Sequence, residues 1–184
     1  MGTIRSPLPA KFFVGMLSPD PPLFIACADI LCREYGPLDY QSPLLPWDKT
    51  DYYREEMGDG IVRTFIFFER LMDMAMLPNI KHRTNDIERD FTTPIGDIFK
   101  RRINLDPGYI TEAKVVLAST KDFAHRVYVG SSIYAEVTLK YSSKDQTFVP
   151  CDHTYPDYGS KEYRAVFNQA RAQLRSTLRS PGQK

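Results

Sequence analysis

The chain reads Arg102-Ile103-Asn104-Leu105-Asp106-Pro107-Gly108-Tyr109 near its middle, a short strand pattern that leads directly into a turn. Because side chains alternate along a strand, Ile103 and Leu105 should face one side and the polar residues the other. Pro107 and Gly108 favour the turn that follows. The polar side would carry a cation, an amide and a carboxylate, from Arg102, Asn104 and Asp106. This stretch predicts a strand with one face for the core and one for a binding site.

The residues before this stretch predict alternating strands and helices. The expected elements are a strand at 11–17, a helix ending near Tyr35, extended segments at 38–45 and 61–68, and a helix at 78–91. Gly36 is expected to end the first helix, because glycine adopts the left-handed terminal conformation easily. Residues 52–61 resemble the tip of a hairpin, with Asp59 and Gly60 as its turn.

The residues after it predict a run of short strands and one last helix. Turn-like segments separate the expected strands at 113–119, 125–129, 132–141 and 146–151, so we expect an antiparallel meander. A helix should follow at 160–179. The fold class predicted is α+β, with a ferredoxin-like strand-helix-strand-strand-helix-strand first part, continued by the meander and the C-terminal helix. We expect a single domain over residues 1–179 and a disordered tail at 180–184.

Composition narrows the class of protein. The chain has 184 residues, of which 42% are hydrophobic and 26% charged, which suits an ordinary folded domain. The longest apolar run, Leu23–Cys32, contains Asp29 and is too short to span a bilayer, so no membrane partner is expected. Three cysteines without framework spacing favour free thiols and a cytoplasmic location. Residues 1–92 carry a net negative charge and residues 93–184 a net positive charge. The basic second half would suit an anionic partner.

Several motifs together resemble a bacterial family catalogued as domain of unknown function 4416, and the resemblance covers nearly the whole chain. They are Phe13-Val14-Gly15-Met16, Tyr35-Gly36-Pro37, Tyr52-Tyr53-Arg54-Glu55-Glu56-Met57-Gly58, Ile103-Asn104-Leu105-Asp106-Pro107-Gly108-Tyr109, Lys121-Asp122 with His125-Arg126, Ile133-Tyr134-Ala135-Glu136-Val137-Thr138, and Thr154-Tyr155-Pro156-Asp157-Tyr158. The resemblance implies membership of that family. It implies no particular activity, ligand or catalytic residue.

The usual signatures of catalysis and cofactor binding do not occur. The three histidines are scattered, and Cys151-Asp152-His153 points successive side chains in opposite directions, so no metal site is expected. No Gly-x-Ser-x-Gly, Gly-x-Gly-x-x-Gly or Gly-Lys-Ser/Thr motif is present, which disfavours an ordinary hydrolase elbow, Rossmann site or P-loop. The sequence therefore does not indicate which cofactor, if any, the protein uses.

The polar faces of the meander strands are the better candidates for a site. In the strand at 132–141, apolar residues at odd positions should face the core and leave Tyr134, Glu136 and Thr138 opposite. In the strand at 125–129, Val127 and Val129 should share the core side with His125, with Arg126 and Tyr128 on the other side. If these strands pair with the one ending at Asp106, their polar residues gather on one face. The alternative is an ordinary solvated sheet face.

The predicted site has two groups of residues. Ligand binding is assigned to Arg102, Asn104, Arg126, Tyr134, Thr138, Tyr155 and Asp157. If the protein is an enzyme, the acid-base groups are expected to be Asp106, His125 and Glu136. The tyrosine-rich segments at 52–53 and 155–158 would serve either to stack on a planar ligand or as lids over the core. The predicted function is binding of an anionic small molecule, with a nucleotide as one candidate.

The expected last helix offers an alternative function. An apolar stripe, formed by Tyr163, Val166, Phe167, Ala170, Leu174 and Leu178, should dock on the core. A basic stripe runs beside it, formed by Lys161, Arg164, Asn168, Arg171, Arg175 and Arg179. This stripe would be a solvated face paired with the acidic first half, or a contact surface for RNA or protein.

Overall fold

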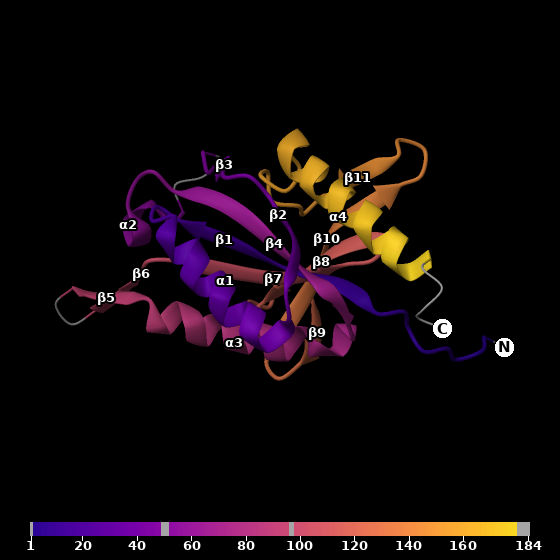
Figure 1. Ribbon diagram of the computed structural model, residues 1–184, viewed down its shortest axis with the longest axis horizontal. Helices are drawn as coiled ribbons and strands as arrows, with labels where there is room; N and C mark the ends of the chain where they lie inside the picture. Colours follow the sequence, from indigo (N-terminus) through magenta and orange to yellow (C-terminus); the bar gives the residue numbers. More distant parts are fainter. Residues whose placement is uncertain (1, 49–51, 96–97, 180–184) are drawn as a thin grey trace.

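The computed structural model describes residues 2–48, 52–95 and 98–179, so the predicted tail at 180–184 lies outside the described residues (Figure 1). Nine strands form one sheet, in the order β11-β10-β8-β7-β1-β4-β2, with β3 beside β4 and β9 beside β10. The strands of this sheet are β1 (Ala10–Ser18), β2 (Leu38–Gln41), β3 (Leu45–Pro46), β4 (Val62–Met72), β7 (Asn104–Ile110), β8 (Lys114–Ser119), β9 (Val127–Gly130), β10 (Ile133–Ser142) and β11 (Thr147–Pro150). A separate hairpin consists of β5 (Thr92–Ile95) and β6 (Ile98–Arg101).

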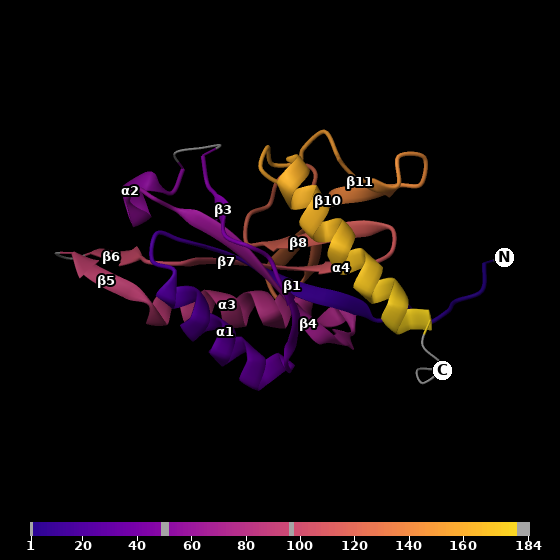
Figure 2. The same ribbon diagram turned by 45° about the horizontal axis from the view of Figure 1, so that its top comes forward.

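Helices cover both faces of the sheet. The helices are α1 (Pro22–Tyr35), α2 (Arg54–Met57), α3 (Leu77–Asp90) and α4 (Lys161–Arg179), with a short 3-10 helix, η1, at Met74–Met76. Figure 2 shows α1 and α3 on one side of the sheet and α4 on the other, and the two hydrophobic cores divide in the same way. Of the helices in the described ranges, none is long and apolar enough to cross a membrane. The fold is α+β, as predicted.

The central strand β1 supplies side chains to both cores. Phe12, Val14 and Met16 pack toward α1 and α3, whereas Phe13 packs toward α4, where its ring lies 5.1 Å from that of Phe167. The Phe13 ring occupies the space beside Gly108 of β7, because a Cβ built there would lie 2.6 Å from the ring and 2.3 Å from the Val116 carbonyl oxygen. Glycine is therefore required at position 108 by close packing.

The first part of the fold follows the predicted order of elements. In sequence, β1, α1, β2, β4, α3 and β7 give strand-helix-strand-strand-helix-strand, and their strands lie in the sheet as β7-β1-β4-β2 with antiparallel neighbours. The ferredoxin-like assignment stays a prediction. The predicted hairpin tip at 52–61 is wrong, because residues 54–57 form the short helix α2, which Gly58 ends with a positive φ of 85°. The hairpin β5–β6 was not predicted.

The meander is present, but two of its predicted core faces are wrong. Val127 and Val129 of β9 are exposed, because β9 is a short strand at the edge of the sheet that pairs with β10 alone among the described strands. Val137 of β10 is also exposed, because the pairing of β10 with β8 shifts register between Val137 and Leu139. An irregularity of this kind changes which side chains face the core.

The sheet opens between β7 and β8, and this opening positions the candidate site. β7 pairs with β1 over its whole length, yet it pairs with β8 only from Gly108 to Ile110. At Leu105 helix α3 replaces the missing strand partner. Glu88 Oε1 accepts the Leu105 N–H (2.6 Å), and Lys81 Nζ donates to the Leu105 carbonyl oxygen (3.0 Å). The first half of β7 therefore has an outer edge that none of the described strands covers.

Candidate functional site

A buried arginine occupies the α4 side of the sheet next to this opening. Arg63 extends from β4 across the neighbouring strand β1, where a Cβ at Gly15 would lie 3.0 Å from its Nη1 atom. Its Nη2 atom lies 3.5 Å from Asp106 Oδ2 on β7 and 3.9 Å from Asp157 Oδ2. Gly15 thus gives the guanidinium a path over the central strand. The Arg63 side chain is 2% exposed.

Arg63 is surrounded by aromatic rings but makes few hydrogen bonds. Its guanidinium carbon lies 4.9 Å from the ring centroid of Trp47 and 5.5 Å from that of Tyr158. Nη1 donates to the Tyr158 hydroxyl (3.2 Å), whereas Nε has no partner among the described residues. Three more buried polar atoms near Arg63 lack a hydrogen-bond partner among the described residues, namely Trp47 Nε1, Tyr163 Oη and Asp157 Oδ2. An unsatisfied buried group costs about 1–3 kcal/mol, so this cluster is poorly satisfied by protein atoms alone.

Burial also sets the acid-base behaviour of the cluster. Desolvation raises the pKa of the Asp157 carboxyl, and the nearby Arg63 guanidinium opposes that rise. Burial likewise raises the pKa of Tyr53 and of Tyr163, so both phenols keep their protons over the physiological range. The hydroxyl groups of this region therefore act as hydrogen-bond donors or acceptors and not as phenolate bases.

Asp106 connects the arginine to a second set of polar side chains. Asn104 Nδ2 donates to Asp106 Oδ2 (2.8 Å), and Asn104 Oδ1 accepts from the Tyr53 hydroxyl (3.2 Å) and from Arg101 Nη1 (3.0 Å). Arg101 also forms a two-pronged pair with Glu56, through contacts of 2.7 Å each. Although Asp106 lies on an interior strand, its side chain is 26% exposed. Solvent reaches this carboxylate because the sheet opens beside it.

A separate buried ion pair lies on β10 and the segment before β9. Arg126 Nε donates to Glu136 Oε2 (2.8 Å), and the two side chains are 2% and 1% exposed. Glu136 also accepts from Thr138 Oγ1 (3.2 Å) and contacts His125 Nε2 (3.1 Å). The His125 ring stacks on that of His153 with centroids 4.4 Å apart. Glu136 is thus a well-satisfied buried carboxylate, and His125 is the partly exposed member of the cluster.

A series of contacts, closed by the chain between Tyr155 and Tyr158, joins the two clusters, and we refer to its members as the polar ring. Its members are Arg63, Asp106, Asn104, Tyr53, Tyr52, Lys121, Arg126, Tyr155 and Tyr158. The Tyr52 and Tyr53 rings lie 4.8 Å apart, and Lys121 Nζ donates to the Tyr52 hydroxyl (2.9 Å). The Lys121 carbonyl oxygen accepts from Arg126 Nη1 (3.1 Å), and Arg126 Nη2 donates to the Tyr155 hydroxyl (2.7 Å). Three residues further along, the chain reaches Tyr158 and returns to Arg63.

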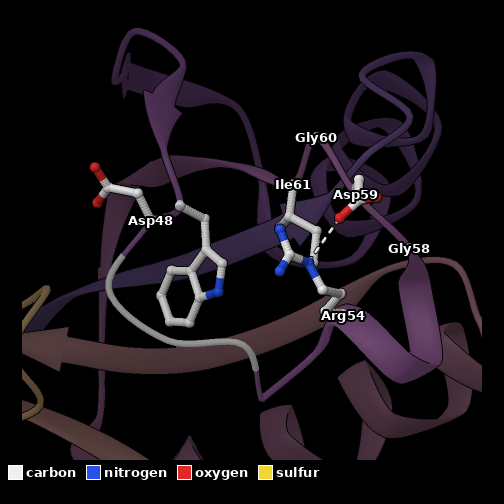
Figure 3. A pocket seen from close by; sticks show the side chains of 7 residues that line it. Asp48, Arg54, Gly58, Asp59, Gly60 and Ile61 are labelled. Atoms are coloured by element: carbon white, nitrogen blue, oxygen red, sulfur yellow. Dashed lines mark hydrogen bonds and ion pairs between the residues drawn. The ribbon is translucent and has the colours of Figure 1, made fainter.

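The polar ring spans the opening of the sheet, because it takes residues from β7 and from the turn after β8. A pocket of about 230 Å³ lies next to it, lined by Trp47, Asp48, Arg54, Gly58, Asp59, Gly60 and Ile61 (Figure 3). Arg54 points toward Asp59 across this pocket, and its Nε atom donates to the Asp59 carboxylate (2.6 Å). Trp47 connects the pocket to the polar ring, since its indole packs on Arg63. None of the residues that the sequence predicted as site residues lines this pocket.

The predicted site residues separate into three groups. Asn104, Asp106 and Asp157 lie at the Arg63 cluster. Those at the Glu136 cluster are His125, Arg126, Glu136, Thr138 and Tyr155. The structure places Arg102 away from the ring, since it precedes β7 and its Nη2 atom donates to Asp20 (2.6 Å). Tyr134 packs its ring 5.6 Å from that of Tyr128 on β9, and its hydroxyl interacts with Asp122.

Sequence reasoning missed Arg63 and Trp47. Arg63 lies in the apolar segment at 61–68, where it is the only charged residue. A charged side chain inside a strand buried on both faces requires partners. This lone arginine could therefore have indicated a buried polar site. Trp47 carried no such signal, because its place depends on the path of the chain between β3 and α2.

Helix α4 docks as predicted, but its basic stripe has a different partner. Phe167, Leu174 and three other stripe residues are buried, and Leu178 is partly buried. Arg175 Nε lies 2.8 Å from Glu112 Oε1, and Arg171 Nε donates to the Glu112 carbonyl oxygen (2.6 Å). Arg171 and Arg175 therefore meet the turn between β7 and β8, and not the acidic first half of the chain. No group of three or more His, Cys, Asp or Glu side chains in the described ranges is placed to hold a metal ion.

Comparison with known proteins places the chain in a family. A family model described as domain of unknown function (DUF4416) matches residues 8–174 of the 184. The chain belongs to this family. Neither a curated protein nor a solved structure matches the chain. The DUF4416 match takes in every residue of the polar ring, from Tyr52 to Tyr158.

The Tyr155 hydroxyl provides a first test of the polar ring. It accepts from Arg126, whose side chain is 2% exposed, so Tyr155→Phe removes a partner from a buried cation. We expect the free energy of unfolding to fall by about 1 kcal/mol, measured by urea denaturation. Tyr128→Phe, on the exposed edge strand, is the matched control and should change stability less. Equal stability of the Tyr155 variant and the wild type would show that this contact holds nothing in place.

Proposed function

We propose that the protein binds an anionic small molecule at the polar ring, on the α4 side of its sheet, and that a nucleotide is the best candidate. The observation that carries this proposal is the state of Arg63. Its guanidinium is almost completely buried, yet it makes a single hydrogen bond to a described residue. Its two carboxylate neighbours lie at 3.5 and 3.9 Å, beyond good hydrogen-bond distance.

The unpartnered atoms around Arg63 suit a ligand rich in oxygen. Three of the four can donate a hydrogen bond, namely Arg63 Nε, Trp47 Nε1 and Tyr163 Oη. Oxygen atoms of a phosphate or carboxylate accept such bonds. Because these oxygens are charged, their bonds to a guanidinium are stronger than those of a neutral acceptor. Lys121, at the opposite side of the ring, adds a second positive charge with solvent access. The donor set therefore favours an anion.

Asp106 argues for a ligand that carries donors as well as a negative charge. A bare phosphate would be repelled by this carboxylate, whereas the amino group of a base or the hydroxyl of a sugar would donate to it. Tyr52 and Tyr155 are 64% and 46% exposed, so each presents an aromatic surface at the rim of the ring. Aromatic side chains of this kind stack on nucleic acid bases. A nucleotide combines the three properties, which are a phosphate, hydrogen-bond donors and a planar ring.

A thermal-shift panel tests the proposal. The protein would be heated with nucleoside mono- and diphosphates, sugar phosphates and inorganic phosphate in turn. We expect at least one nucleotide to raise the melting temperature, by about 5–10 °C at a concentration of about 100 times its Kd. Inorganic phosphate should give a smaller shift. A panel without any stabilising anion would overturn the proposal.

Paired variants locate the binding. Lys121→Gln should weaken a nucleotide about tenfold, which corresponds to about 1.4 kcal/mol of binding free energy. Arg102→Gln is the control, because Arg102 is also an exposed cation but pairs with Asp20 away from the ring. Arg102→Gln should bind as the wild type does. If both variants bind equally well, the nucleotide occupies another part of the surface.

The alternative of RNA or protein binding through α4 has less support. Arg171 and Arg175, in the middle of the basic stripe, are engaged by Glu112, and Arg171 also lies over the Tyr141 ring at 3.3 Å. An RNA phosphate would have to compete with these contacts. A cytoplasmic location forms part of the proposal and is supported by the three cysteines, each of which is a free thiol.

A further inference from the structure

The edge strand β9 presents an unusual surface. Val127, Tyr128 and Val129 are 65%, 62% and 39% exposed, and Phe123 and Val137 beside them are 49% and 38% exposed. Within the described strands β9 pairs only with β10, so its outer edge has no strand partner. Natural proteins usually protect such an edge with charged residues or proline, because an open apolar edge associates with other strands.

Charged residues are missing from this hairpin. The nine residues from Val127 to Ala135 contain none, although 26% of the chain is charged. The hairpin is nevertheless held firmly in place, since the Ser131 carbonyl oxygen lies 2.7 Å from His82 Nε2 on α3. The Tyr128 hydroxyl accepts the Ser132 N–H (3.3 Å) within the same hairpin. An ordered, uncharged and apolar edge is therefore available for pairing.

We propose that a second copy of this chain pairs with β9, so that two sheets join edge to edge about a two-fold axis. Antiparallel pairing of a strand with itself satisfies two-fold symmetry, because the same residues serve on both sides. Close to such an axis a charged residue would lie near the same residue of the other copy, so like charges would repel each other. The uncharged stretch from Val127 to Ala135 removes that repulsion. The same stretch has no charge that would attract an oppositely charged partner.

The strength of this contact is limited by the length of the strand. β9 has four residues, so the pairing buries little surface compared with a standard interface of about 1,600 Å². We therefore expect a reversible equilibrium of monomer and dimer in the micromolar range, and not an obligate dimer. The interface adjoins the polar ring at Arg126, which directly precedes Val127 and whose guanidinium carbon lies 4.6 Å from the Phe123 ring centroid. Each interface variant is therefore also tested for nucleotide binding.

Sedimentation velocity of the full chain over a range of concentrations tests this inference. The wild type should shift from monomer to dimer as its concentration rises. Val127→Lys adds a charge to the pairing strand and should remain monomeric at concentrations where the wild type is dimeric. Ile25→Lys is the matched control, since Ile25 is 67% exposed on α1, and it should dimerise as the wild type does.

Hydrogen exchange of the backbone amides identifies the surface. Amides of residues 127–130 should exchange more slowly at high protein concentration, because pairing protects the outer edge of β9. A wild type that is monomeric at every concentration would overturn the inference. So would a Val127→Lys variant that dimerises as strongly as the wild type. Circular dichroism of each variant checks that its fold is intact.

Discussion

Phe167→Ala is expected to lower the free energy of unfolding by about 3–5 kcal/mol, the usual cost of removing a buried aromatic side chain. Phe167 is completely buried, and its ring meets those of Phe13 and Phe65 at 5.1 Å each. The substitution leaves a cavity between α4 and the central strands, which the rigid sheet cannot fill by collapsing. Chemical denaturation followed by far-UV circular dichroism measures the loss.

An exposed apolar residue provides the control for this prediction. Ile25 lies on α1 and is 67% exposed, so Ile25→Ala should change stability by no more than about 0.5 kcal/mol. A loss below about 1 kcal/mol for Phe167→Ala would contradict the docking of α4 on the sheet. The comparison therefore separates loss of core packing from a general effect of truncating a side chain.

Arg126→Met is expected to have a similarly large effect, about 3–5 kcal/mol, because it leaves Glu136 charged and buried without its main partner. The two side chains are 2% and 1% exposed and meet at 2.8 Å. Methionine keeps much of the volume of arginine, so the loss reports mainly on charge and hydrogen bonds. Urea denaturation of the variant at neutral pH measures it.

A double-mutant cycle shows whether the pair is coupled. Glu136→Gln removes the opposite charge, and the double variant should be more stable than the sum of the two single losses predicts, because no unpaired charge remains buried. Strict additivity of the losses would mean that Arg126 and Glu136 do not interact in solution. The cycle also tests whether this cluster is structural, as the four hydrogen bonds that Arg126 donates indicate.

Much of the fold could be predicted from regular side-chain patterns. Helix α4 was placed correctly because its apolar residues recur with helical spacing. The strand β7 was predicted only in part, because the turn expected at Pro107 and Gly108 is wrong: the strand continues through both residues to Ile110, paired with β1. The patterns failed where the backbone is irregular. The register shift after Val137 and the edge position of β9 exposed three valines that simple alternation assigns to the core.

The candidate site was only partly predictable, because its contacts join distant parts of the chain. Tyr53 and Asn104 are 51 residues apart, and Arg126 and Tyr155 are 29 residues apart. Alternation along each strand correctly paired Asn104 with Asp106, but it cannot show that β7 and β8 separate beside them. That opening depends on Glu88 and Lys81 of α3, which bind the backbone of Leu105.

The fluorescence of Trp47 tests the central claim most directly. Trp47 is the only tryptophan of the chain, and its ring lies 4.9 Å from the Arg63 guanidinium, so its emission reports on the polar ring without any labelling. Titration with the nucleotide that raises the melting temperature should change the emission saturably, with the same Kd as calorimetry. Lys121→Gln should move that curve to higher concentration. A nucleotide that binds by calorimetry but leaves Trp47 emission unchanged would contradict binding at this site.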